Sequence, residues 1–251
     1  TWKEYHDNVS YLALGLSKRG FKLGDVIGLI GDNKPSWLFF ELAAQAVGGM
    51  SLGIYRDTLD EEVGYLINAA KVDFAYAEDQ EQVDKLLSIK RAKNNNITIF
   101  YEDSRGLKEL NNPHIIDMLD LINEGKAIAA KNQNKYNQLI DKISPDQNAI
   151  LCTTSGTTSN PKLAMLPGGK LIEHVVRYLN VDPKTIDDEY VSVLPFPWIM
   201  EQIYAVGFNI VGGMKVNFPE RPDTAMEDLR EIGPTFMLGA PRLWEQIAAD
   251  M

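Results

Sequence analysis

Short apolar runs alternate with amphipathic segments along the chain. Residues 26–30 form a continuous apolar run, as expected of a strand that is covered on both faces. Residues 4–19 before it carry apolar side chains at helical spacing, and residues 35–47 after it begin with the proline favoured at the start of a helix. Such alternation predicts parallel βαβ units. The expected fold class is therefore α/β, with doubly wound, mostly parallel sheets and helices on both faces.

The alternation predicts the remaining elements as well. Further strands are expected at residues 50–55, 72–77, 97–101, 149–153, 162–166, 190–194, 214–218 and 235–238, and further helices at 81–93, 115–124, 170–179, 200–211, 224–231 and 242–249. A capping-box pattern at residues 58–61 predicts one more helix that reaches Ala70.

A change of composition predicts the domain boundary. Residues 111–144 are rich in Asn, Lys and Gln, which is typical of a solvated connector. Asn112, before Pro113, is expected to cap the helix of this connector. We therefore expect a first α/β subdomain at residues 1–145 and a second at residues 146–251.

The second subdomain begins with a segment rich in hydroxyl groups, residues 152–166, CTTSGTTSNPKLAML. Hydroxyls can donate to phosphate oxygens, Gly156 permits a close backbone approach, and Lys162 supplies a mobile positive charge. The segment follows a predicted strand, and ligands of open α/β sheets bind at the carboxyl ends of the strands. The sequence therefore predicts a loop that holds the phosphates of a nucleotide.

Two alternatives to this phosphate-binding loop are considered, the Walker P-loop and a solvated loop. The Walker P-loop is excluded, because Pro161 stands where its second glycine belongs and Leu163 follows Lys162 where a Ser or Thr is required. A solvated loop rich in Ser and Thr remains open on composition alone. The preceding strand favours phosphate binding.

Four motifs in order resemble the adenylate-forming superfamily. Residues 154–163 resemble its phosphate-binding signature, [ST]-S-G-[ST]-[ST]-G-x-P-K-G. Residues 194–202, LPFPWIMEQ, resemble the L-P-x-x-H-x-x-E stretch of long-chain fatty acyl-CoA synthetases, with Trp198 in place of the histidine. Residues 234–245 resemble their P-T-x-x-x-x-V-P-R-x-[WF]-E stretch, and residues 48–55 resemble G-x-x-x-x-G-I-Y. The resemblance covers the whole chain and implies the N-terminal part of such an enzyme, without its C-terminal domain.

This resemblance implies activation of a long-chain fatty acid. The carboxylate attacks the α-phosphate of ATP, pyrophosphate leaves with Mg²⁺, and the thiol of CoA then displaces AMP from the acyl-adenylate. By resemblance, Lys162 and Thr154 are the catalytic residues and Thr154 is the magnesium ligand. The phosphate contacts implied are those of Thr154, Ser155, Gly156, Thr157, Thr158 and Lys162.

The resemblance also implies an acyl pocket. Its wall and support are expected at Trp198, Glu201, Gly239, Ala240 and Pro241. A core tryptophan remains the alternative for Trp198, and a carboxylate placed at a helix start by the macrodipole remains the alternative for Glu201.

Composition limits the partners and the compartment. The formal net charge of −10 argues against nucleic acid. The single cysteine, Cys152, excludes an internal disulfide and fits the cytoplasm. No signal peptide or spanning segment is visible, so membrane contact is expected to be peripheral at most. His6, His114 and His174 show no metal-ligand spacing. The sequence leaves open whether the protein forms a homodimer.

Two other functions stay open as well. One is a noncatalytic nucleotide-binding or interaction module of the same fold. The other is an adenylating ligase for an aryl, short-chain or amino acid. The four motifs favour the fatty acid-CoA ligase, and as part of such an enzyme this chain is expected to be inactive alone.

Overall fold

A computed structural model of the chain describes residues 1–93, 97–107, 112–154 and 161–249. The chain divides into two compact units, Thr1–Lys170 and Leu171–Met251. The helices of the first unit are α1 (Trp2–Lys18), α2 (Pro35–Ala46), α3 (Asp60–Ala69), α4 (Gln80–Lys93), α5 (Met118–Lys131) and α6 (Asn137–Ile140). Its strands are β1 (Val26–Ile30), β2 (Met50–Ile54), β3 (Phe74–Ala77), β4 (Thr98–Tyr101), β5 (Ile115–Asp117), β6 (Asn148–Thr154) and β7 (Lys162–Pro167).

The strands of the first unit form one sheet. Among the described residues this sheet has seven strands in the order β5-β4-β3-β1-β2-β6-β7. Neighbouring strands are parallel except for β6 and β7, which form an antiparallel pair. The central strand β1 is buried along its whole length, as its continuous apolar run predicts. The expected α/β fold with a mostly parallel sheet is confirmed.

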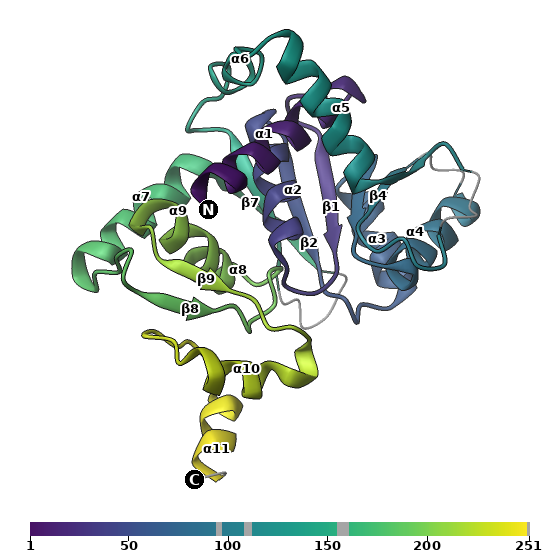
Figure 1. Ribbon diagram of the computed structural model, residues 1–251. Helices are drawn as coiled ribbons and strands as arrows, with labels where there is room; N and C mark the ends of the chain where they lie inside the picture. Colours follow the sequence, from purple (N-terminus) through teal and green to yellow (C-terminus); the bar gives the residue numbers. More distant parts are fainter. Residues whose placement is uncertain (94–96, 108–111, 155–160, 250–251) are drawn as a thin grey trace. The chain divides into compact units, whose positions relative to one another are not determined.

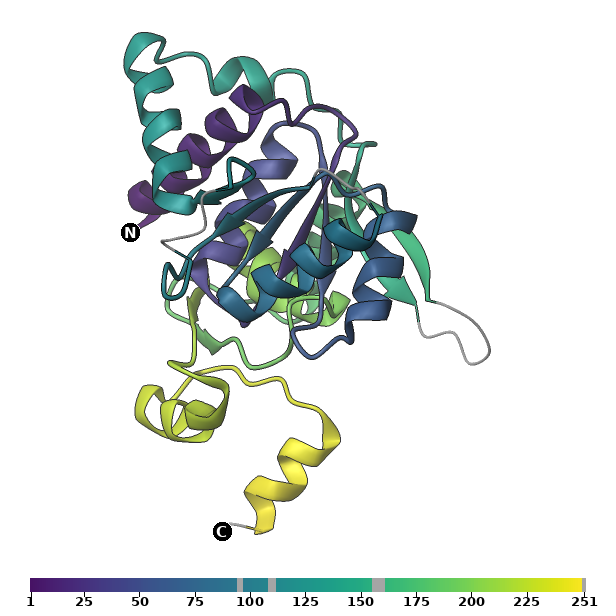
Figure 2. The same cartoon turned by 90° about the vertical axis from the view of Figure 1, so that its right-hand side faces the viewer.

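Helices cover both faces of this sheet. α1, α2 and α5 lie on one side, and α3 and α4 lie on the other (Figures 1 and 2). On the second side, Val63 and Leu86 bury their side chains in the same aliphatic cluster as strand residues such as Ile99. On the first side α1 and α5 approach closely, since a Cβ atom at Gly125 would lie 1.8 Å from the carbonyl oxygen of Tyr11. A side chain at position 125 would therefore push the two helices apart.

The second unit has a smaller sheet and an aromatic core. Its elements are α7 (Gly168–Val181, which begins in the first unit), β8 (Glu189–Val191), α8 (Ile199–Glu201), the π-helix η1 (Gln202–Gly207), α9 (Phe208–Gly212), β9 (Lys215–Asn217), the short helix η2 (Pro222–Thr224), α10 (Ala225–Ile232) and α11 (Pro241–Ala249). β8 and β9 are parallel. The rings of Tyr178, Tyr204, Phe208 and Phe236 contact one another, and these contacts hold α7, η1 and α9 together.

Several expected elements differ in the structure. Residues 115–117 form a strand instead of the start of a helix, because they pair with β4, and α5 begins after its cap, Asp117. The capping box expected at residues 58–61 is absent, since Leu59 caps α3 without a side-chain bond. The helix expected at 200–211 is interrupted by the π-helix η1, and in the segment 235–238 Phe236 makes an isolated bridge to Tyr190.

The division into units also differs from the boundary expected at residue 145. β6 pairs with β2, and β7 pairs with β6. Both strands therefore complete the sheet of the first unit, and the two units divide after Lys170. The phosphate-loop segment consequently belongs to the first unit.

Candidate functional site

The ends of the proposed phosphate loop lie on the hairpin formed by β6 and β7. β6 runs parallel to β2, so Thr154 lies at the carboxyl edge of the sheet. Thr154 pairs with Lys162 across the hairpin, and its hydroxyl donates a hydrogen bond of 3.3 Å to the carbonyl oxygen of Lys162. The hairpin thus brings together the two residues that the sequence analysis predicts to be catalytic. The other predicted phosphate contacts, Ser155, Gly156, Thr157 and Thr158, lie outside the described residues.

Lys162 has the exposure that an anion-binding residue needs. Its side chain is exposed, and in the described part of the chain it makes no ion pair with an acid. A lysine in this state can approach a phosphate without breaking an internal contact. Thr154 is also exposed, so its hydroxyl can reach the same ligand. Both side chains are therefore open to a ligand at this edge of the sheet.

Tyr65 anchors the same hairpin from α3. Its hydroxyl donates a hydrogen bond of 3.0 Å to the carbonyl oxygen of Pro161, the residue before Lys162. Sequence analysis did not find Tyr65, because 96 positions separate it from Pro161 and no local pattern connects the two. The contact fixes the backbone at the point where the loop returns to β7.

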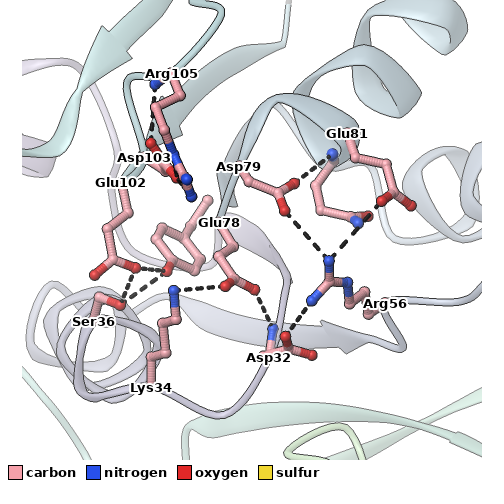
Figure 3. Close-up of polar contacts among 12 residues, drawn as sticks. Asp32, Lys34, Ser36, Arg56, Glu78, Asp79, Glu81, Glu102, Asp103 and Arg105 are labelled. Carbon is pink, nitrogen blue, oxygen red and sulfur yellow. Dashed lines mark hydrogen bonds and ion pairs between the residues drawn. The ribbon is translucent and has the colours of Figure 1, made fainter. Parts of the chain in front are cut away.

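A polar network lies along the same edge of the sheet (Figure 3). Lys34 Nζ lies 2.6 Å from Glu78 Oε1, and Glu78 Oε2 accepts a hydrogen bond of 2.6 Å from the backbone N–H of Asp32. Arg56 forms an ion pair with Asp32 and lies 3.5 Å from Asp79. Burial and then the charge of Glu78 raise the pKa of Asp32, although Arg56 opposes this effect. The network ties together the loops after β1, β2 and β3.

Hydrogen bonds extend this network toward β4. Glu102 accepts hydrogen bonds of 2.7 Å from Ser36 Oγ and from Tyr76 Oη. Glu78 can approach the end of β1 because residue 31 is glycine, where a Cβ atom would lie 2.6 Å from the Cβ atom of Glu78. The cations of this network are paired with acids. We therefore assign the network to the shape of the sheet edge and not to phosphate binding.

Cys152 lies in β6 near this edge and does not have the properties of a nucleophile. Its side chain is buried. Burial and, to a lesser extent, the charge of Glu41 raise the pKa of Cys152 to about 11. A thiol with this pKa is almost entirely protonated at neutral pH. Cys152 is therefore a small buried strand residue.

In the second unit, the predicted pocket residues lie in two segments. Trp198 precedes α8 and is 39% exposed, so it is not an ordinary core tryptophan of this unit. Gly239, Ala240 and Pro241 lie before and at the start of α11, and Ala240 and Pro241 are exposed. Trp244 donates a hydrogen bond of 3.1 Å to the carbonyl oxygen of Gly239 and so holds this turn. No hydrogen bond between described residues joins the turn to Trp198.

Glu201 lies at the end of α8 with no exposed surface. Its carboxyl group accepts hydrogen bonds from Tyr190 Oη, at 2.7 Å, and from Ser192 Oγ. Burial raises the pKa of Glu201 to about 7, while the hydrogen bonds from Ser192 and Tyr190 act in the opposite direction. The interpretation as a carboxylate held by a helix macrodipole is therefore replaced by one of a sequestered, hydrogen-bonded group. Neither hydrogen-bond partner of Glu201 was predicted by a local pattern.

Comparison with known proteins identifies the family. The AMP-binding enzyme family matches residues 1–251. The chain belongs to this family of adenylate-forming enzymes. The placement of Thr154 and Lys162 at a sheet edge agrees with a family that uses ATP.

Relatives of this AMP-binding chain include fatty acid-CoA ligases. It is 30% identical to the long-chain-fatty-acid–CoA ligase ACSBG1 of Rattus norvegicus over 257 residues, which cover 98% of this chain and 34% of the relative. The chain thus spans about a third of that protein.

Two solved structures share the fold. The structure of FadD1, a long-chain-fatty-acid-CoA ligase of Archaeoglobus fulgidus, matches with a TM-score of 0.75 and 16% identity over 94% of this chain and 43% of that one. The complex of VinN with L-aspartate also has a TM-score of 0.75 and 16% identity, over 100% of this chain and 62% of that one. At this identity these likenesses show the fold alone.

The acidic, histidine and cysteine side chains of the described residues do not form a metal site. In the described ranges, no group of three or more His, Cys, Asp or Glu residues is arranged to hold a metal ion. A magnesium ion would therefore need ligands besides the hydroxyl of Thr154.

Among the helices of the described residues, none has the length and apolarity required to cross a membrane.

Proposed function

We propose that the whole protein activates a long-chain fatty acid with ATP and transfers the acyl group to CoA. The observation that carries this proposal is the pairing of Thr154 with an exposed Lys162 at the carboxyl edge of the sheet, in a chain of the AMP-binding family. The choice of a fatty acid is supported by the 30% identity to ACSBG1 of Rattus norvegicus. We also propose a cytoplasmic location, with peripheral membrane contact at most.

The proposed chemistry needs control of charge more than a protein nucleophile. ATP supplies the phosphoanhydride and Mg²⁺ neutralises part of its charge. Lys162 would bind the β- and γ-phosphates and stabilise the charge that develops on pyrophosphate as the carboxylate approaches. Thr154 would donate its hydroxyl to a phosphate or place it on the magnesium ion. We extend the same role to Ser155, Gly156, Thr157 and Thr158 by their match to the family signature.

The acid would bind against the second unit. The half-exposed indole of Trp198 offers an apolar surface for a hydrocarbon chain. Gly239, Ala240 and Pro241 would form a further wall, held by the hydrogen bond from Trp244. Glu201 is fully buried and would support this wall without touching the substrate.

The test is acid-dependent ATP–pyrophosphate exchange. We expect the longest natural form of the protein that contains this chain to catalyse exchange with long-chain fatty acids and to form acyl-CoA. The chain alone is expected to give negligible exchange. Exchange only with an aryl, short-chain or amino acid would replace the substrate, and the likeness to VinN bound to L-aspartate makes the amino acids a necessary arm of this panel. Binding of ATP without exchange for any acid would favour the noncatalytic module.

A further inference from the structure

A buried carboxyl group links the strand and the helix of the second unit. Glu201 is at the end of α8, whereas its hydrogen-bond donors Tyr190 and Ser192 lie in β8 and directly after it. All three side chains have no exposed surface. Among the described residues no lysine or arginine pairs with Glu201, and the two hydroxyls are its hydrogen-bond donors. A carboxyl group buried without a counter-charge opposes folding, and such groups are common at functional sites.

The backbone connects this carboxyl group to Trp198. The N–H of Glu201 donates a hydrogen bond of 3.0 Å to the carbonyl oxygen of Trp198, and the N–H of Trp198 donates one of 2.9 Å to Pro195. The side-chain amide of Gln202 donates a further bond of 2.9 Å to the carbonyl oxygen of Phe196. The segment 195–198 is therefore held by Glu201, the last residue of α8, and by Gln202, the residue that follows it. Gln202 is also the first residue of the π-helix η1, and π-helices are frequent at functional sites.

We propose that Glu201 is a positioning residue, which holds Trp198 in place at the acid-binding pocket through its hydrogen bonds to Tyr190 and Ser192. The strand β8 provides the fixed point, because Tyr190 pairs with Val216 and its ring lies 5.8 Å from that of Phe236. A displaced carboxyl group would release α8 from β8 and with it the indole. This inference rests on the proposed function, since it gives Trp198 a role in binding the acid.

The kinetic test uses Glu201→Gln in the longest natural form of the protein. Glutamine keeps the size of the side chain but cannot accept both hydroxyl bonds with the same oxygens. We expect the KM for a long-chain fatty acid to rise about tenfold, the effect of losing one or two buried hydrogen bonds, and the KM for ATP to stay unchanged. Tyr190→Phe should act in the same direction. Glu231→Gln, an exposed residue of α10, is the matched control and should change neither constant.

A double-mutant cycle separates positioning from general damage. If Glu201 acts through Trp198, its substitution should have little further effect on the KM for the acid in a Trp198→Ala protein. Additive effects would overturn the inference, as would a rise in both KM values accompanied by a fall in melting temperature.

A second measurement does not depend on turnover. Acrylamide quenching of Trp198, taken as the difference between each protein and its Trp198→Phe counterpart, should be stronger after Glu201→Gln. Unchanged quenching would overturn the inference even in an active ligase. If the protein activates no acid but the quenching changes, the proposed function fails and the positioning of Trp198 by Glu201 stands.

Discussion

Tyr65 of α3 donates a hydrogen bond of 3.0 Å from its hydroxyl to the carbonyl oxygen of Pro161, next to Lys162. The bond fixes one end of the segment that carries the proposed phosphate contacts. A lysine side chain reaches a phosphate productively when its backbone is already in place, because less freedom is then lost on binding.

Tyr65→Phe should therefore weaken ATP binding without unfolding the protein. The ring keeps its packing and only the hydroxyl bond is lost, so we expect the KM for ATP to rise about two- to tenfold and the free energy of unfolding to fall by about 1 kcal/mol. Steady-state kinetics and urea unfolding measure the two effects. Tyr11→Phe, on α1, is the control. If Tyr65→Phe and Tyr11→Phe have the same KM for ATP, Tyr65 does not support the phosphate-binding segment.

Lys162→Ala should affect catalysis far more than stability. The side chain is exposed and has little packing to lose, whereas a charge that stabilises leaving pyrophosphate contributes about a hundredfold or more to the rate. ATP–pyrophosphate exchange and thermal unfolding are the measurements, and Lys142→Ala, another exposed lysine, is the control. An unchanged exchange rate would exclude Lys162 from phosphate binding.

Local patterns predicted most of the first unit. The apolar run at β1 and the helical spacing of α1 depend on neighbours in sequence, and both elements appear where expected. β5 was predicted as a helix because its strand character comes from pairing with β4 and not from its own three residues. The same reason explains the boundary, since no local pattern shows that β6 pairs with β2.

The candidate site shows the same limit. The spacing of Thr154 and Lys162 was visible in the sequence, and the hairpin brings the two residues together. The hydrogen bond that holds this hairpin was not visible in the sequence, because its donor Tyr65 lies 96 positions from Pro161. The burial of Glu201 depends on β8 packing against α8, so a charged residue at an apparent helix start could not be distinguished from a sequestered one.

Gly125→Ala should destabilise the contact between α1 and α5. The new Cβ atom would lie 1.8 Å from the carbonyl oxygen of Tyr11, and backbone atoms cannot yield as a flexible side chain does. We expect a loss of about 3 kcal/mol, typical of overpacking, in urea unfolding. Gly168→Ala is the matched control, because its Cβ atom would lie an ordinary 3.4 Å from Ala149. A similar loss in both variants would contradict the close approach of the helices.

Glu201 should make stability depend on pH. Burial raises the pKa of Glu201 from 4.5 to about 7 in the folded state, so the unfolded chain releases this proton at lower pH than the folded one. The contribution of the protonated Glu201 to the free energy of unfolding is complete below pH 4.5. It is lost as the pH rises toward 7, and the whole loss is about 3 kcal/mol. The nearest titratable group, Tyr190, has its pKa raised by burial and by Glu201, so it stays protonated in this range.

Glu201→Gln removes this titration and no other, so the quantity to measure is the difference in unfolding free energy between the variant and the wild type. In urea unfolding at pH 5 and pH 8, the free energy of unfolding of the variant should increase relative to that of the wild type as the pH rises. The exposed Glu231→Gln should show no such trend. A difference that stays constant with pH would mean that the Glu201 carboxyl is already ionised in the folded protein at pH 5, with Tyr190 and Ser192 compensating fully for its burial.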